Sequence, residues 1–162
     1  MNRLDPLYVP LSGFNLIEAS AGAGKTHTIT ALHVRLVVEL GIAVNRILVV
    51  TYTNAATKEL RDRIRSRLLQ VRAAFLRGRA PADDELAVRL LDLQPDRDIA
   101  IRRLTNAVRG FDEAAIFTIH GFCKRALGDN AFASGLSFET ELLADTGDLL
   151  QEIVDDFWRR EL

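Results

Sequence analysis

The sequence predicts an α/β protein in which helices flank a parallel β-sheet. A short apolar run at residues 14–19 leads into a glycine-rich turn and then into a helical pattern. Residues 47–51 form an apolar, β-branched run without polar alternation, which is typical of a strand buried on both faces. A third strand-like run follows at residues 114–119. Strand, helix and strand within roughly 40 residues predict a right-handed βαβ crossover.

The first helix is expected to begin at Lys25 and to end at Gly41. Its apolar residues recur at three- and four-residue spacing: Ile29, Leu32, Leu36, Val37 and Leu40. A longer helix is expected from about Ala55 to Gly78. It carries one apolar stripe, consisting of Leu60, Ile64, Leu68, Val71 and Phe75.

Shorter helices should follow. One begins at the proline and acidic residues of 81–85 and continues through Leu86, Leu90 and Leu93. Another spans residues 99–108, and a short helix follows the third strand at 121–127. Residues 128–140 read as a loop. A last helix begins near Thr146, with an apolar side formed by Leu149, Leu150, Ile153, Val154, Phe157 and Trp158.

The composition of the chain is typical of a globular protein and excludes some other classes. Of the 162 residues, 48% are hydrophobic, which is ordinary for a globular chain. Acidic residues (22) and basic residues (21) nearly balance, so any nucleic-acid surface must be local. The single cysteine, Cys123, cannot form an internal disulfide, and no apolar run reaches the ~18 residues of a membrane span. The N-terminus shows no signal-peptide core, so we expect a cytoplasmic protein without a membrane segment.

The glycine-rich turn is a phosphate-binding loop, with alanine in place of the first glycine of the pattern. It comprises Ala19, Ser20, Ala21, Gly22, Ala23, Gly24, Lys25 and Thr26. Gly22 and Gly24 let the backbone curl so that its N–H groups point inward at a di- or triphosphate. Lys25 would reach the β- and γ-phosphates, and the Thr26 hydroxyl would join the shell of a Mg²⁺ ion. The sequence therefore predicts an ATP and Mg²⁺ site; the alternative is a turn that only reverses the chain.

Hydrolysis would also need carboxylates at the end of another strand. The acids nearest a later strand, Asp112 and Glu113, precede the strand at 114–119 and read as a solvated turn. We therefore expect the hydrolytic carboxylates to be missing from this chain.

Polar and aromatic residues follow the second and third strands. Thr53 and Asn54 come after residues 47–51, and His120 and Phe122 come after residues 114–119. The carboxyl edge of an open α/β sheet is where ligands bind. Plainer interpretations stay open: Thr53 and Asn54 as helix caps, His120 as a loop histidine, and Phe122 as a core residue. A His120–Cys123 catalytic dyad is rejected, because nothing orients the histidine.

The helix after Asn54 is locally basic. Its positive residues are Lys58, Arg61, Arg63, Arg65, Arg67, Arg72, Arg77 and Arg79. Such a surplus can hold phosphates, or it can form a solvated helix face.

Together these motifs resemble superfamily 1 helicases of the UvrD/Rep kind. The resemblance is narrower to the RecB family, the beta subunit of exodeoxyribonuclease V. It is carried by residues 16–26, 47–64, 111–123 and 130–160. UvrD-like members carry a glutamine ahead of the phosphate loop, and residues 1–15 contain none, which favours RecB.

The resemblance implies a P-loop NTPase (RecA-like) fold. Residues 1–127 would form part of the ATP-binding domain, with a helical excursion at about 80–110. Residues 128–162 would begin an inserted helical subdomain. The chain would thus be the N-terminal fragment of a longer protein.

The resemblance also implies a function. ATP hydrolysis would drive a DNA strand through the motor and unwind double-strand ends in recombinational repair, beside RecC-like and RecD-like subunits and a distant nuclease domain. Thr53, Asn54, His120 and Phe122 would contact the single strand, where hydroxyl and amide groups suit phosphate and a ring stacks on a base. The alternative is a stand-alone P-loop protein, either a small kinase or a non-catalytic nucleotide sensor.

Overall fold

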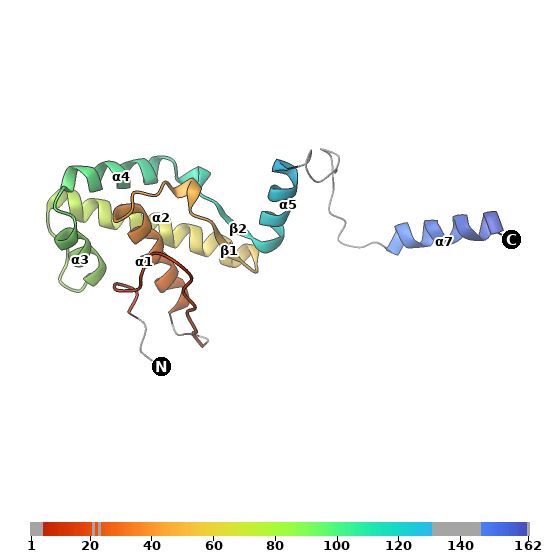
Figure 1. Cartoon of the computed structure of the whole chain (residues 1–162), viewed down its shortest axis with the longest axis horizontal. Coiled ribbons are helices and arrows are strands. Elements are labelled where there is room, and N and C mark those ends of the chain that lie inside the picture. The colour runs from red at the N-terminus through yellow and green to blue at the C-terminus, as the bar shows by residue number, and fades with distance from the viewer. Residues whose placement is uncertain (1–4, 21, 23, 131–146, 162) are drawn as a thin grey trace. The chain divides into compact units, whose positions relative to one another are not determined.

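The computed structural model describes residues 5–20, 22, 24–130 and 147–161 (Figure 1). It divides into two compact units, Met1–Ile119 and His120–Leu162, which are described separately. The sequence analysis places the domain boundary later, after residue 127; that domain organisation stays a prediction.

The first unit alternates helices with short strands. Its elements are, in chain order, α1 (Lys25–Val38), the 3-10 turn η1 (Val44–Arg46), β1 (Val49–Thr51), α2 (Asn54–Arg77), α3 (Glu85–Leu93), α4 (Arg97–Arg109), the 3-10 turn η2 (Phe111–Glu113) and β2 (Ile116–Thr118). The second unit contains α5 (Ile119–Asp129), apart from its first residue, and α7 (Gly147–Glu161). Every helix expected from the sequence is present, with its ends shifted by a few residues.

The sheet of the described residues consists of β1 and β2. They pair in parallel, with Val49 opposite Ile116 and Thr51 opposite Thr118. The mixed α/β class and the parallel pairing are therefore confirmed. The crossover between the two strands contains α2, α3 and α4.

The strand expected at residues 14–19 is not formed, so that prediction is wrong. Phe14 is fully exposed and Leu16 is 89% exposed. A strand gains stability from a paired edge and a covered apolar face. This segment has no paired edge within the described residues, and Phe14 and Leu16 lie in solvent, whereas Ile17 is half-buried.

The expected burial of residues 47–51 on both faces is also wrong. Ile47 is buried and Val49 packs against the core, whereas Leu48 and Val50 are 46% and 41% exposed. Alternation of this kind belongs to a sheet covered on one face. The covering element is α2, which contacts both strands.

Helix α2 organises the core of the first unit. It packs against α4, α1 and both strands, and α4 runs beside it (Figure 1). The expected stripe is confirmed in full: Leu60, Ile64, Leu68, Val71 and Phe75 are all buried. The helix ends at Gly78, whose φ of 71° is the left-handed conformation that glycine adopts without strain.

Helix α1 buries the expected stripe only in part: Val37 is buried and Leu36 packs against the core. Ile29 and Leu40 are 39% and 52% exposed, and the helix ends at Val38. Its buried residues are Thr28, Thr30, Ala31, His33, Val34, Arg35, Val37 and Val38. This helix contacts α2, α3 and α4, so it buries polar residues that a purely apolar pattern does not single out.

The second unit exposes its apolar residues. Phe122 and Leu127 of α5 are 36% and 47% exposed, and α5 buries no residue. On α7 the exposed apolar residues are Leu150, Ile153, Val154, Phe157 and Trp158. The loop expected at 128–140 falls largely outside the described residues. Among the helices that are described, none combines the length and apolarity needed to cross a bilayer.

Candidate nucleotide site and strand ends

The phosphate loop adopts the backbone conformation that its glycines permit. Gly22 and Gly24 have φ angles of 77° and 83°, and a Cβ added at either would meet no atom within 4 Å. Residues with a side chain rarely adopt this left-handed conformation, so both positions favour glycine for backbone reasons. The open space beside them leaves room for a ligand to approach the backbone closely. Ala21 and Ala23 of the predicted site lie outside the described residues.

The amino end of α1 has backbone N–H donors that no acidic side chain of the first turn accepts from. The Thr28 N–H is the first to bond within the helix, to the carbonyl of Gly24 at 2.9 Å. No acidic residue lies in the first turn, and no side chain caps the helix. The N–H groups of Lys25, Thr26 and His27 precede the first helical bond, at the positive end of the helix dipole. This donor set fits a phosphate group.

Lys25 closes the loop on itself. Its Nζ donates to the carbonyl oxygens of Ala19 (2.9 Å) and Ser20 (2.8 Å), which begin the loop. An ammonium group has three N–H donors, so one remains for a phosphate oxygen. The side chain is exposed, at the mouth of the loop.

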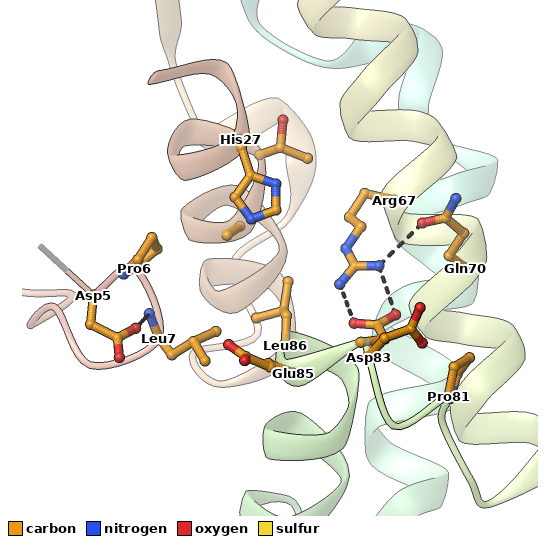
Figure 2. A pocket seen from close by; sticks show the side chains of 13 residues that line it. Asp5, Pro6, Leu7, His27, Arg67, Gln70, Pro81, Asp83, Glu85 and Leu86 are labelled. Atoms are coloured by element: carbon orange, nitrogen blue, oxygen red, sulfur yellow. Dashed lines mark hydrogen bonds and ion pairs between the residues drawn. The ribbon is translucent and has the colours of Figure 1, made fainter. Parts of the chain in front are cut away.

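A pocket of about 590 Å³ lies beside the start of α1 (Figure 2). Its walls come from α1, α2, residues 5–7 and residues 81–86; α1 contributes His27, Thr30 and Ala31. His27 directly follows Thr26 along the chain, but none of the described residues of the phosphate loop is among those that line the pocket. Its volume falls in the range of small-molecule sites.

An ion pair fixes the far wall of this pocket. The guanidinium of Arg67 donates to both carboxylate oxygens of Asp84, and Nη1 also donates to Gln70 (Figure 2). Asp84 additionally caps α3 by accepting from the Ala87 N–H at 2.9 Å. Burial alone would raise the pKa of Asp84, but the hydrogen bonds from Arg67 and Ala87 and the charges of Arg67 and His27 lower it overall.

Sequence reasoning missed this ion pair. The acids at 81–85 predict only a helix start, and their partner lies 17 residues earlier on another helix. No periodicity joins two such positions, so only the packing of α2 and α3 reveals the contact.

Thr53 and His120 follow the two paired strands along the chain. Because Thr51 lies opposite Thr118, Thr53 and His120 each lie two residues beyond a paired strand end. Thr53 caps α2: its Oγ1 accepts from the Ala56 N–H at 3.1 Å, which confirms the capping interpretation. Capping leaves contact with a ligand possible, because Thr53 and Asn54 are both exposed.

His120 and Phe122 belong to the second unit, where both lie in α5 and are exposed. The loop interpretation of His120 and the core interpretation of Phe122 are therefore wrong for the described part of the chain. Both side chains are accessible to solvent and hence to a ligand.

Most of the basic residues predicted on α2 have hydrogen-bond or ion-pair partners within the protein, some of them at its surface. Arg61 donates to the carbonyls of Ala114 and Ile116, and Arg72 donates to Thr105. Three more make ion pairs: Arg63 with Glu59, Arg65 with Asp112, and Arg67 with Asp84. These arginines therefore contribute to contacts within the protein more than to a surface that could bind the phosphates of a nucleic acid.

Asp112 and Glu113 lie in η2, at the amino end of β2, where the sequence placed them. The Asp112 side chain is 90% exposed, as expected for a solvated turn. Within residues 5–20, 22, 24–130 and 147–161, no cluster of three or more His, Cys, Asp or Glu residues forms a metal site.

A glycine-rich loop with free N–H donors at the amino end of a helix, in a chain that also forms a parallel β-sheet, is the kind of site that nucleotide-dependent motors use. Residues 5–161 match the model of the UvrD/REP helicase N-terminal domain, and the chain belongs to that family.

Among curated proteins the chain is similar to subunits named RecBCD enzyme subunit RecB. It is 50% identical to that of Escherichia coli (strain K12) over 97% of the chain, and 43% identical to that of Haemophilus influenzae over 96%. The counterpart from Mycobacterium tuberculosis (strain ATCC 25618 / H37Rv) is 37% identical over 87% of the chain. The chain spans 13–14% of the length of these relatives.

Proposed function

We propose that the chain is the ATP-binding N-terminal portion of an ATP-dependent DNA helicase subunit of the RecB kind. The observation that carries the proposal is the left-handed glycine loop at the amino end of α1, closed by Lys25. Membership of the UvrD/REP family supplies the motor context. The fold proposed is that of a P-loop NTPase, with residues 1–127 in the ATP-binding domain.

In this proposal the N–H groups at the start of α1 hold the phosphates, and the remaining donor of Lys25 neutralises a terminal phosphate oxygen. The Thr26 hydroxyl would hold Mg²⁺ together with the phosphates; the ion would neutralise charge that develops during phosphoryl transfer. We expect binding without efficient hydrolysis, because Asp112 and Glu113 lie at the amino end of β2.

The strand ends would contact DNA. Thr53 and Asn54 are exposed at the start of α2 and offer a hydroxyl and an amide to phosphate or sugar. Phe122 offers an exposed ring for stacking on a base, and His120 a further polar contact. The relatives are named as subunits of a RecBCD enzyme, which supports RecC-like and RecD-like partners for the whole protein. A role in DNA repair and a cytoplasmic location are further parts of the proposal.

The test of nucleotide binding is calorimetric titration of the chain with Mg-ATP. Lys25→Ala should weaken binding by about 10- to 100-fold, since a hydrogen bond to a charged group contributes ~1.5–3 kcal/mol. Lys124→Ala, which removes an exposed lysine of α5, is the matched control and should leave the affinity unchanged. Rapid DNA-independent ATP turnover that Lys25→Ala abolishes would contradict the proposal and favour a stand-alone P-loop enzyme.

The DNA contact is tested separately with a labelled single-stranded oligonucleotide. Phe122→Ala should weaken binding by ~1–3 kcal/mol, the magnitude of one lost base–aromatic stack. Leu127→Ala removes a comparably exposed apolar side chain from the same helix and should have little effect. Equal losses in the two variants, measured by fluorescence anisotropy, would show that α5 contributes general apolar surface and that Phe122 has no particular role.

A further inference from the structure

Helix α2 contains one lysine, Lys58, and the structure separates this lysine from most of the arginines on the same helix. Five arginines have partners within the protein: Arg61, Arg63, Arg65, Arg67 and Arg72. Lys58 is exposed, and in the part of the chain that the structure describes its ammonium group makes no hydrogen bond or ion pair. All three N–H donors of Lys58 therefore remain for a ligand.

Lys58 lies one helical turn beyond Asn54. Residues four apart on a helix share one face, with their Cβ atoms about 5–6 Å apart. Both side chains are exposed. Thr53, which precedes Asn54, caps the same end of the helix and is exposed as well. Lys58 therefore extends the surface through which Thr53 and Asn54 would contact DNA.

The acidic residues near Lys58 do not neutralise its charge. The first turn of α2 contains no acidic residue. Glu59 is paired with Arg63 at 2.8 Å. Asp62 lies one turn further along the helix, but no ion pair joins it to Lys58 among the described residues. The surface at the start of α2 therefore presents an unpaired positive charge.

The type of residue also fits a phosphate contact. Of the 21 basic residues of the chain, only three are lysines. An arginine forms a planar fork that fixes one geometry, as Arg67 does with Asp84. The ammonium group of lysine is a compact point charge on a flexible stem, so it can meet a phosphate from several directions. Such a contact suits a strand whose phosphates pass the site one after another.

We propose that Lys58 is a DNA-binding residue that contacts the phosphate backbone of the single strand, next to Thr53 and Asn54 and independently of the base sequence. This inference rests on the proposed DNA contact at the strand ends. It separates two kinds of contact, because Phe122 would stack on a base whereas Lys58 would bind only the backbone.

A phosphate contact has a signature in the salt dependence of binding. Each phosphate of a single strand that a protein neutralises contributes about 0.7 to the slope of the logarithm of affinity against the logarithm of salt concentration. Lys58→Met should therefore make this slope shallower by about 0.7. Binding should be about fivefold weaker at 0.1 M salt, and the difference should vanish near 1 M. The loss should be the same for an oligothymidine strand and for a strand of abasic sites, because neither depends on a base contact.

Two matched variants separate this contact from a general effect of charge. Arg77→Met removes the other basic side chain of α2 that has no partner among the described residues. Arg77 lies about 28 Å further along the helix, at 1.5 Å per residue, so the slope should not change. Lys58→Arg keeps the charge and should keep the slope. Methionine forms helices about as well as lysine and arginine, so these variants should fold.

The experiment titrates the 162-residue chain and the three variants into a labelled oligothymidine strand at several salt concentrations, followed by fluorescence anisotropy. A shallower slope in Lys58→Met alone supports the proposal. An unchanged slope in Lys58→Met overturns it, as does an equal change in Arg77→Met or a loss of affinity that is the same at every salt concentration. If the wild-type chain does not bind the strand, the proposed DNA contact fails and the role of Lys58 fails with it. Wild-type binding with an unchanged slope in Lys58→Met contradicts this inference alone.

Discussion

His33 is a buried histidine without a hydrogen-bond partner. It is 2% exposed within α1, and neither ring nitrogen is bonded. Burial lowers its pKa from 6.5 to about 4, so the ring is neutral in the folded protein at neutral pH. In the unfolded chain the ring takes up a proton as the pH falls through 6.5, before the folded protein does. The contribution of His33 to stability is therefore fully present above pH 6.5 and is lost as the pH falls from 6.5 towards 4.

We predict that His33→Leu stabilises the protein. At pH 7 the free energy of unfolding should rise by about 1 kcal/mol, because an unsatisfied buried polar group is removed. The loss of stability between pH 7 and pH 5 should also shrink, since this ring contributes a slope of at most ~1.4 kcal/mol per pH unit. Urea unfolding at the two pH values measures both effects.

His33→Asn separates polarity from titration. It keeps a buried polar group and removes the ionisable one, so the protein should be weaker at pH 7 yet still lose the steep pH dependence. Asp84, whose folded pKa lies below 3.8, stays ionised throughout this pH range and does not contribute. An unchanged pH slope in both variants would show that His33 does not titrate as described.

Two arginines of α4 hold the carboxyl ends of neighbouring helices. Arg103 donates to the carbonyls of Val38 (2.6 Å) and Glu39 (3.3 Å) at the end of α1, and Arg97 donates to Phe75 (2.7 Å) at the end of α2. Carbonyls at a helix end lack partners within the helix, and a positive charge there also favours the helix dipole. These contacts therefore join three helices through backbone groups.

We predict that Arg103→Met lowers the free energy of unfolding by ~1.5–3 kcal/mol, because it removes hydrogen bonds between a charged donor and half-buried carbonyls. Arg102→Met changes the exposed arginine next to it and should cost less than ~0.5 kcal/mol. Chemical denaturation of the pair gives the comparison. Similar costs for the two variants would mean that the helix-end contact contributes nothing beyond the apolar stem.

The elements differ in how far the sequence predicts them. The stripe predicted for α2 is confirmed throughout, because that helix packs on the sheet and on α1, α3 and α4, so its period decides which residues are buried. The stripe of α1 was partly wrong, because Arg35 and His33 occupy its buried face in place of Ile29 and Leu40. The strand at residues 14–19 failed because its stability depends on neighbours, and apolarity alone does not supply a paired edge.

The candidate site follows the same rule. The phosphate loop could be predicted, because its glycines and Lys25 act through local backbone geometry. The Arg67–Asp84 pair and the Arg35 contacts to residues 5–9 could not, because each joins segments distant along the chain. The sequence predicts a site formed by neighbouring residues, such as the phosphate loop. It does not predict contacts between distant segments, because these depend on how the helices pack.

On the scale of the whole molecule, the described core belongs to the first unit. Every buried hydrophobic residue found in the described ranges lies between Ala31 and Ile116, and α5 buries none. The second unit instead exposes apolar residues such as Phe157 and Trp158. The stability of the first unit should therefore depend little on the residues after Ile119.

We predict that a chain truncated after Ile119 folds and melts like the full chain, with a shift of less than about 4 °C, the change expected for ~1 kcal/mol. Circular dichroism at the helix band follows the transition, and the truncated chain should keep its affinity for Mg-ATP because the phosphate loop is retained. Single-strand DNA binding should fall, because His120 and Phe122 are removed. The internal control is the full chain carrying Phe122→Ala, which removes one proposed DNA contact without shortening the protein.

A truncated chain that fails to fold would show that residues beyond Ile119 stabilise the first unit. A truncated chain that folds but loses ATP affinity would place part of the nucleotide site in the second unit.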